Sequence, residues 1–363
     1  MSDFFEIDFL DVESNKSGDA ITLRYQIDRI SCIHVIDGGF KDTGQKVVDH
    51  IKKYYGNPTY IDHVVASHPD GDHAGGLRTV LETFEVGRLW MLRPWVYADE
   101  IIHRFSRYSS VENLKKRLRE VYPNIAALEE IAGERDIPIY EPFQGEMIGA
   151  FHVLAPTKQR YLDLVVQSER TPESAEEARA AAAKGFTTLL ERAAVKAVSL
   201  LKAAWGVEVF SPEETSAENE MSVIQYANLC EKRIVLTADA GRAGLAEAAD
   251  YAPYVGLALP GVDRFQVPHH GSRRNVSTEV LDRWLGPRFP AKPKSGEETF
   301  TAIISSAKKD EDHPRKAVVR ACIHRGAKVI TTEGTSIRTG HNAPHREGWT
   351  AVTPVEYPEE QEE

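Results

Sequence analysis

Residues Tyr60–Leu77 read YIDHVVASHPDGDHAGGL, and this stretch decides how we interpret the rest of the chain. Its first half, Tyr60–Ser67, is an apolar run typical of a strand. The loop that follows places four metal-binding side chains within six residues: His68, Asp70, Asp72 and His73. Burying so many polar groups together is costly unless an ion binds them. The stretch therefore predicts half of a metal site.

The spacing of these residues indicates two metals rather than one. Residues two apart in an extended loop point to the same side, so His68, Asp70 and Asp72 can face one cavity, with His73 at a neighbouring position. Two carboxylates and two imidazoles exceed what one tetrahedral zinc with an open position uses. An EF-hand is excluded, because its D-x-D-x-D-G order and distal glutamate are missing. The plain alternative is an exposed acidic turn with incidental histidines.

Composition limits the classes of function. The chain has 363 residues, of which 42% are hydrophobic, enough for one large core or two modest ones. The formal net charge of −11 implies no general attraction to nucleic acid or anionic lipid. Three widely spaced cysteines fit reduced thiols better than disulfides. We see no signal peptide and no apolar run of about 20 residues, so we expect a soluble, cytoplasmic protein that does not enter a membrane.

Alternating strand and helix patterns predict sheets with helices packed outside them. Two strands within 19–37 are followed by a helix over 43–55 and by strands at 60–67 and 88–92. Further strands are expected at 150–154, 222–226, 233–237, 264–267 and 300–305, with a helix at 314–325. Lys328–Thr332 and Ser336–Thr339 indicate a hairpin about Glu333-Gly334.

Two helical stretches interrupt this pattern, at about 95–135 and 160–218. The second contains an Ala-rich helix that begins near Ser174 and a further helix up to Gly206. The last residues, 356–363, are acidic and have little to bury, so we expect a disordered tail. We therefore expect a single domain over 1–355 that carries two helical insertions.

A two-metal site also needs a bridging carboxylate and a closing histidine. Asp239, after the strand Arg233–Thr237, is the bridging candidate, although an Asp at a strand end is more often a turn residue or a helix cap. His269 and His270 follow the short strand Arg264–Val267, and two adjacent histidines at a strand exit favour a functional role. Which of the two coordinates is open at this point.

Together these motifs resemble the metallo-β-lactamase superfamily. They are His68–Leu77 (HPDGDHAGGL), Leu236–Asp239 (LTAD) and Val267–Ser272 (VPHHGS). The branch that they resemble most contains the hydrolase domain of ComEC-type DNA-uptake proteins. The similarity covers most of 15–340 outside the insertions, including segments around Asp19, Asp37 and His313. It implies an α/β (α+β) fold, a four-layer αββα sandwich with its site at one edge of the paired sheets.

The resemblance assigns two sets of ligands, bridged by Asp239. The first set is His68 and Asp70, and the second is Asp72, His73 and one of His269 and His270. We favour His269 as that ligand, which leaves His270 for proton transfer or substrate contact. Two divalent ions, Zn²⁺ or Mn²⁺, are the implied cofactors.

Two departures from the superfamily pattern concern the first metal. Asp70 stands where the wider superfamily has histidine. No histidine occupies the usual third-ligand region before the second insertion, and His152 is expected in the core. The first position is therefore rich in oxygen and short of ligands, which favours Mn²⁺ or a weakly held Zn²⁺.

The resemblance also implies a chemistry. Two cations lower the pKa of a shared water, so that a bridging hydroxide is available, and they clamp the oxygens of a phosphodiester. Asp72 could orient the nucleophile, and His270 or His313 could protonate the leaving oxygen. The candidate substrate contacts are Asn219, Ser222, Ser272 and Arg273. Capping a strand entry and a solvated loop are their plain alternatives.

Three functions remain open from the sequence. The first is a metal-dependent phosphodiesterase or nuclease, acting on a phosphodiester or nucleic-acid substrate. The second is a hydrolase of another ester, a lactone or an amide, because a fold does not determine its substrate. The third is an effector that works with a partner protein in a larger assembly. The oligomeric state and the role of the insertions are also open.

Overall fold

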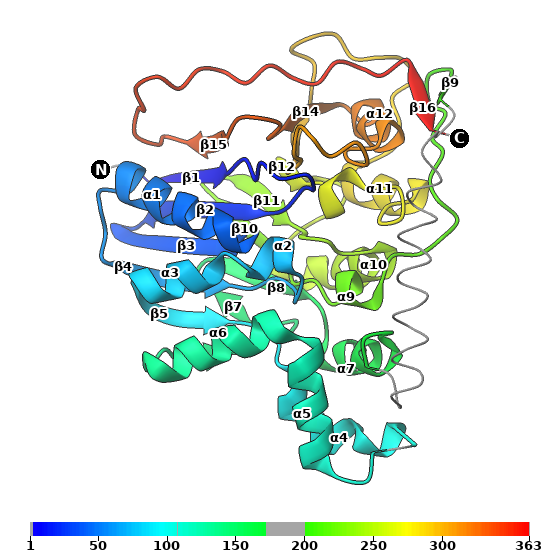
Figure 1. Ribbon diagram of the computed structural model, residues 1–363. Helices are drawn as coiled ribbons and strands as arrows, with labels where there is room; N and C mark the ends of the chain where they lie inside the picture. Colours follow the sequence, from blue (N-terminus) through cyan, green and yellow to red (C-terminus); the bar gives the residue numbers. More distant parts are fainter. Residues whose placement is uncertain (1–2, 107, 172–199, 363) are drawn as a thin grey trace.

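Two seven-stranded sheets form the body of the protein (Figure 1). The computed structural model describes residues 3–106, 108–171 and 200–362. The first sheet has the order β15 (Ile337–His341), β1 (Phe4–Phe9), β2 (Ala20–Ile27), β3 (Ile30–Gly38), β4 (Tyr60–Val65), β5 (Glu85–Trp90), β6 (Ile139–Tyr140). The second has the order β14 (Ala327–Thr331), β13 (Phe300–Ile304), β12 (Arg264–Gln266), β11 (Lys232–Leu236), β10 (Ile224–Leu229), β8 (Phe151–Ala155), β7 (Met147–Ile148).

The two sheets repeat one pattern of strand directions. In the first sheet, β15, β1, β2 and β3 form antiparallel pairs, and β3 to β6 form parallel pairs. In the second sheet, β7, β8, β10 and β11 are antiparallel, and β11 to β14 are parallel. Parallel strands end at one edge of a sheet, which is where ligands bind in open α/β sheets.

Helices cover the outer faces of both sheets. Figure 1 shows α1 (Gly44–Tyr54) and α3 (Leu77–Thr83) beside the first sheet, and α10 (Arg242–Tyr251), α11 (Thr278–Leu285) and α12 (Lys316–His324) beside the second. Strand β11 shows the layering, because alternate residues point to opposite faces. Ile234 and Leu236 pack in the core shared with the first sheet, whereas Val235 packs with the outer helices. The predicted mixed α/β sandwich is confirmed.

The two helical insertions contain most of the other helices in the described part of the chain. The first contains α4 (Ala98–Ile101), α5 (Val111–Val121) and α6 (Pro123–Glu134). The second begins with α7 (Lys158–Gln167) and ends with α9 (Ala217–Glu220). The short α2 (Gly71–Ala74) lies in the first motif, and single 3₁₀ turns are η1 (Lys41–Thr43), η2 (Pro94–Tyr97), η3 (Ile102–Arg104), η4 (Ala252–Val255), η5 (His269–Gly271). The Ala-rich helix expected near Ser174 lies outside the described residues.

Strand β1 is absent from the sequence-based expectations because it carries two buried acids. Glu6 and Asp8 are both 0% exposed. Arg346 approaches both of them, at 2.8 Å from Glu6 Oε2 and 2.6 Å from Asp8 Oδ1. Burial would raise the pKa of Asp8, but hydrogen bonds from His50 and Arg346 lower it below its usual value. The strand is therefore stable in the sheet because its charges are paired.

The hairpin expected about Glu333-Gly334 is wrong. Strand β14 lies at the edge of the second sheet, and β15 pairs with β1 in the first sheet. The intervening residues therefore cross from one sheet to the other. Both strands have the alternating composition of hairpin strands, and composition does not show which sheet a strand joins.

The disordered tail and the end of the second predicted helix also need correction. A third, small sheet pairs β16 (Glu360–Glu362) antiparallel with β9 (Leu200–Lys202), so neither segment is disordered or helical. The carboxylate of Glu362 accepts hydrogen bonds from the backbone N–H groups of Lys316 and Ala317, at 2.9 and 3.0 Å. The first N–H groups of a helix have no acceptor within the helix, and here the Glu362 carboxylate accepts from two of them. At least one acidic residue of the tail therefore stabilises the start of α12.

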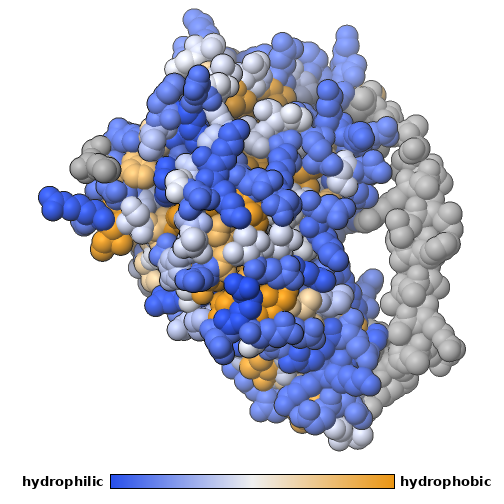
Figure 2. Space-filling model, turned by 60° about the vertical axis from the view of Figure 1, so that its left-hand side comes forward, coloured by the Kyte–Doolittle hydropathy of each residue, from blue (hydrophilic) through white to orange (hydrophobic). Residues whose placement is uncertain are grey.

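The surface shows how the apolar residues are distributed. On the face in Figure 2, hydrophobic residues reach the surface in small groups among hydrophilic ones. In the described parts of the chain, no helix combines the length and the apolar character needed to cross a membrane.

Removing Arg346 is expected to destabilise the protein. Arg346→Ala leaves Asp8 and Glu6 buried with fewer partners, and losing one member of a buried ion pair costs about 3–5 kcal/mol. Arg283→Ala instead breaks a surface pair with Asp250 and should cost at most about 1 kcal/mol. Urea unfolding gives both free energies. Similar losses in the two variants would contradict the structural importance of the buried pair.

Candidate metal centre

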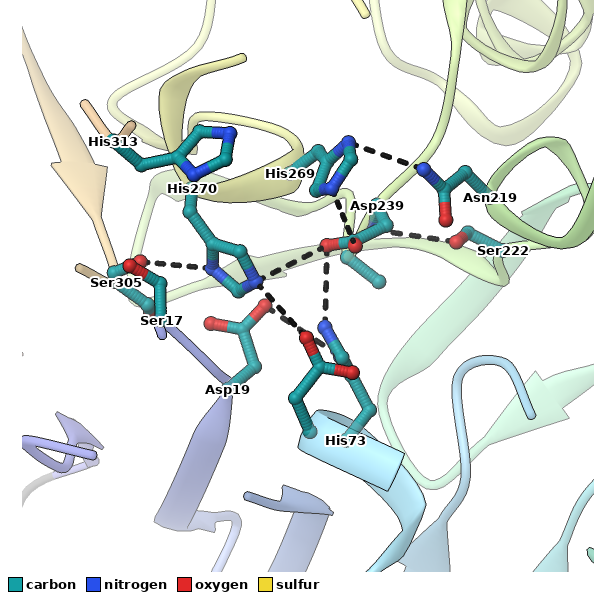
Figure 3. A network of polar contacts seen from close by, with 12 residues as sticks. Ser17, Asp19, His73, Asn219, Ser222, Asp239, His269, His270, Ser305 and His313 are labelled. Atoms are coloured by element: carbon teal, nitrogen blue, oxygen red, sulfur yellow. Dashed lines mark hydrogen bonds and ion pairs between the residues drawn. The ribbon is translucent and has the colours of Figure 1, made fainter. Parts of the chain in front are cut away.

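The sequence motifs meet where strands of both sheets end (Figure 3). Strand β4 leads into the loop that carries His68, and α2 then presents Asp72 and His73. Strands β11 and β12 end shortly before Asp239 and His269. The two glycines before the last residue of the HPDGDHAGGL motif let its backbone pack against that of β3. A Cβ atom at Gly76 would lie 2.0 Å from the carbonyl oxygen of Gly38.

The Asp239 carboxylate is the centre of the site. Its Oδ1 lies 3.2 Å from His73 Nε2 and 3.9 Å from His270 Nε2. Its Oδ2 lies 3.5 Å from His269 Nε2 and 3.6 Å from His68 Nε2. Asp239 is 2% exposed. Four imidazole rings therefore face one buried carboxylate, two for each oxygen.

The other ring nitrogen of His270 and of His73 is anchored as a donor. His270 Nδ1 donates to the carbonyl oxygen of Ser305 at 2.8 Å, and His73 Nδ1 donates to Asp37 Oδ2 at 2.8 Å. Carbonyl and carboxylate oxygens only accept, so Nδ1 carries a proton. Nε2 of each ring is then the nitrogen available to a metal. Metal-binding histidines are commonly oriented in this way.

The same logic applies to His68 and His269. Ser67 Oγ donates to Asp37 Oδ2, so it accepts the hydrogen bond from His68 Nδ1 at 3.1 Å. Asn275 Nδ2 donates to the backbone carbonyls after β11, which turns its Oδ1 toward His269 Nδ1 at 2.9 Å. All four histidines thus present Nε2 to the centre.

Buried atoms without hydrogen-bond partners show that the residues fit a metal. Nε2 of His68, His73 and His270 and Oδ1 of Asp239 have no partner. Leaving several such atoms unsatisfied is costly, and a cation would satisfy them together. Imidazole and carboxylate ligands suit Zn²⁺ or Mn²⁺.

The charge of the site also favours a cation. Burial would raise the pKa of Asp239, but the facing rings of His269, His73 and His270 lower it well below its usual range. Burial would lower the pKa of His270, but Asp239 and Asp72 raise it to about 9. In the absence of metal, protons on the rings thus compensate the carboxylates, and metal binding would release them.

The ligand atoms divide into two positions. Asp72, His73 and His270 form a group whose ligand atoms lie within 4.8 Å of one another, next to Asp239 Oδ1. His68 and His269 share Asp239 Oδ2. The structure thus favours His270 as the partner of Asp72 and His73, opposite to the preference from sequence. His269 lies with His68 beside the other oxygen, although these two and Asp239 do not form one of the candidate metal groups in the described ranges.

An unusual backbone makes this division. His269 and His270 have φ angles of 47° and 55°, in the left-handed region that residues other than glycine rarely adopt. The N–H of His269 donates to the carbonyl oxygen of Ala238 at 3.0 Å, which links the exits of β11 and β12. Such conformations persist where the surrounding structure holds them, often at functional sites.

Asp70 lies apart from this arrangement. Its Oδ1 is 2.6 Å from Arg170 Nη1, and it belongs to none of the candidate metal groups in the described ranges. The predicted role of Asp70 as a metal ligand stays a prediction, and in this structure the carboxylate pairs with Arg170.

His313 lies beside the two positions without joining them. Its ring centroid is 5.5 Å from that of His269 and 6.1 Å from that of His270. Its Nδ1 donates to Asp310 Oδ2 at 3.2 Å, which leaves Nε2 for a substrate. Burial lowers the pKa of His313 to about 4, although the hydrogen bond to Asp310 opposes this.

The predicted substrate contacts hold the site together. Asn219 Nδ2 donates to Thr215 Oγ1 at 2.7 Å beside His269, and Ser222 Oγ accepts the backbone N–H of Asp239 at 3.2 Å. Ser272 Oγ accepts the N–H of Arg274 at 3.3 Å. These hydrogen bonds lie within the protein and do not test substrate binding. The role of Asn219, Ser222, Ser272 and Arg273 in binding a substrate therefore stays a prediction.

Sequence analysis missed the roles of Asp19 and Asp37. Asp37 Oδ2 accepts from both His73 Nδ1 and Ser67 Oγ, so one carboxylate orients two histidines. Asp19 is 1% exposed, accepts from Gln266 Nε2 at 2.8 Å and forms a candidate metal group with His73 and Asp239. Both residues lie in segments that resemble the metallo-β-lactamase superfamily, and this resemblance was the available sign of a role at the site.

A separate cluster of Cys32, His34 and His63 lacks this organisation. Its ligand atoms also lie within 4.8 Å of one another. However, Trp90 Nε1 donates to His63 Nδ1 at 3.1 Å, so the neutral ring carries its proton on Nε2. Cys32 Sγ and the Tyr25 hydroxyl lie 3.2 and 3.3 Å from His34 Nε2. We interpret the cluster as a hydrogen-bonded part of the core.

Comparison with known proteins agrees with the fold and the first motif. Residues 32–136 match the model of the metallo-beta-lactamase superfamily. The match runs from β3 to the end of the first insertion and includes Asp37, His68, Asp72 and His73. The two-sheet architecture is consistent with the metallo-β-lactamase fold. Nothing in the comparisons distinguishes the ComEC-type branch, and no curated protein matches the chain.

Solved structures resemble the chain at low sequence identity. Metallo-beta-lactamase SMB-1 bound to 2-mercaptoethanesulfonate is 10% identical, with 70% of this chain and 78% of that chain covered and a TM-score of 0.30. AidC, a dizinc quorum-quenching lactonase in complex with a product, is 11% identical, with 61% of this chain and 56% of that chain covered and a TM-score of 0.29. A variant of CmlA beta-hydroxylase is 10% identical, with 94% of this chain and 54% of that chain covered and a TM-score of 0.39. The chain spans little more than half of the last two proteins.

Replacing Asp37 tests whether it orients the ligands. Asp37→Asn keeps the size of the side chain but replaces one carboxylate oxygen with an NH₂ group, which cannot accept a hydrogen bond. His73 Nδ1 or Ser67 Oγ therefore loses its acceptor. We expect metal affinity to fall about 10–100-fold, as for other outer partners of ligating histidines. Asp62→Asn is the matched control, because Asp62 accepts the N–H of Ile33 and belongs to none of the candidate metal groups in the described ranges. Competition with a chromophoric chelator measures both, and unchanged affinity in Asp37→Asn would refute the role.

Proposed function

We propose that the protein is a hydrolase that uses two divalent cations, Zn²⁺ or Mn²⁺, held around Asp239. The observation that supports this most strongly is the convergence of four Nε2 atoms on one buried carboxylate, with each Nδ1 anchored elsewhere. The proposed ligands of one position are Asp72, His73 and His270. Those of the other are His68 and His269, and Asp239 serves both.

The residues of the chain have distinct parts in the reaction. Bound cations lower the pKa of water and neutralise charge on the reacting group. Asp72 lies at the exposed side of the centre, with 27% of its side chain exposed, and orients the attacking water. His313 Nε2 exchanges a proton with the water or the leaving group, while Asp310 holds its Nδ1.

A phosphodiester is the substrate we favour. Two-cation centres suit in-line displacement at phosphorus because both the attacking and the leaving oxygen can be stabilised. Arginines also gather beside the His269-His270 turn. Burial lowers the pKa of Arg273, and the nearby charges of Arg315 and Arg274 add to this effect although Glu362 opposes it. Arg274 and Arg315 also pair with Glu213 and Asp312, so a substrate phosphate would compete with these carboxylates for the group.

An ester or lactone is the second candidate, and a pocket favours it. The pocket adjoins the centre at Ser67 and His68, and both insertions contribute to its wall. Apart from these two residues, its lining is apolar or aromatic: Ala66, Pro69, Leu92, Pro94, Tyr122, Ile125, Tyr161 and Met221. The lining suits an uncharged apolar group better than a phosphate, but the pocket is small and its walls are buried, so such a group would enter only with movement of the insertions.

A substrate panel separates the two candidates. We expect an aryl phosphodiester to be hydrolysed with Mn²⁺ or Zn²⁺, and the rate to fall by a factor of about 10³ or more in Asp239→Asn, because the shared carboxylate charge is lost. Metal content of that variant should fall by at least one ion per chain. Hydrolysis of esters or lactones alone would favour the second candidate. A wild-type protein that binds no metal would exclude both.

His313 should affect turnover without affecting metal content. His313→Gln removes a group that exchanges protons, which is typically worth a factor of about 10²–10⁴ in rate. Both metal positions lie on other side chains, so stoichiometry should stay at the wild-type value. Metal analysis beside kcat and KM measures this. Loss of metal in His313→Gln would instead identify His313 as a ligand.

A further inference from the structure

Asp70 forms an ion pair with Arg170 beside the loop that carries His68. Asp70 is two residues from both His68 and Asp72, in the loop that delivers the first motif. Its Oδ1 lies 2.6 Å from Arg170 Nη1, so the carboxylate is paired with a guanidinium. Of the described acids in this motif, Asp72 joins a candidate metal group and Asp70 does not.

Arg170 is fixed from its other side as well. Its Nε lies 3.6 Å from Glu218 Oε1, and Ser168 Oγ donates to the same carboxylate oxygen. Glu218 is 4% exposed and lies in α9, directly before Asn219. Burial would lower the pKa of Arg170, but Asp70 and Glu218 raise it. The guanidinium is therefore a permanent charge between two acids from different segments.

This arrangement makes the two metal positions unequal. The second position has Asp72 and one oxygen of Asp239, so two acids contribute there. The first position has only the other oxygen of Asp239, with the neutral ligands His68 and His269. A guanidinium paired with Asp70 cancels the charge that would otherwise attract a cation to the first position.

We propose that Arg170 is a positioning residue that weakens the first metal position by engaging Asp70. The proposal rests on the proposed two-metal function of the Asp239 centre. The second insertion thereby sets how readily the first ion is taken up and lost. Removal of Arg170 would release Asp70, whose carboxylate would then strengthen the first position.

A zinc titration against a chromophoric chelator tests this on the full chain. We expect wild type to bind one ion tightly and one weakly. In Arg170→Ala the weak step should tighten about tenfold or more, because the guanidinium charge that compensates the Asp70 carboxylate is removed. Damage to the structure does not produce tighter binding, so the direction of the change is diagnostic.

Three matched variants make the result specific. Arg170→Lys keeps a cation beside Asp70 and should stay close to wild type. The double variant Arg170→Ala/Asp70→Asn should lose the gain, since the cycle isolates the dependence on the Asp70 carboxylate. Arg104→Ala removes an arginine from a similar, partly exposed ion pair with Asp163 and should have no effect on zinc binding.

Two results would overturn the proposal. One is an unchanged or weaker first position in Arg170→Ala, or in Arg170→Gln should the alanine variant fail to fold. The other is a loss of metal in Asp70→Asn alone, which would make Asp70 a ligand in the wild-type protein. A wild-type chain that binds no ion, or an Asp239→Asn variant that keeps both ions, would instead refute the two-metal function.

Discussion

The attraction between the Asp239 carboxylate and four imidazole rings is the interaction on which the rest of the site depends. A buried carboxylate without compensation is unstable, and four unprotonated ring nitrogens facing one another are also costly. Each arrangement is acceptable only in the presence of the other and of a positive charge, carried by protons or by metal. Many polar groups around the site, including Asp37, Ser305 and Asn275, serve to hold those rings in place.

The fold makes this convergence possible through its repeated pattern of strand directions. In each sheet the antiparallel half builds the wall, and the parallel half delivers loops to one edge. Strand β4 of the first sheet and strands β11 and β12 of the second end at the same place. Residues separated by some 200 positions in sequence, here His68 and His270, thereby face the same Asp239 carboxylate.

Much of the architecture could be predicted from sequence because it rests on local patterns. Most strands around the site and the residues His68, Asp72, His73 and Asp239 follow from apolar runs and ligand-rich loops. Strand β1 could not be predicted, since its buried acids depend on Arg346, some 340 residues away. The ion pair of Asp70 likewise involves an arginine 100 residues away in sequence. The placement of His269 and His270 at different oxygens of Asp239 depends on backbone angles that composition does not reveal.

The two adjacent histidines have a consequence for how the centre can change. Consecutive residues, both in a left-handed conformation, serve different oxygens of Asp239. In the proposed centre, the separation between the two ions would thus depend on the length of a single peptide unit. Remodelling the loop for one ion would also move the histidine of the other, so the spacing of the pair would be hard to change. Adaptation to other substrates is then left to the insertions, which can vary without disturbing that distance.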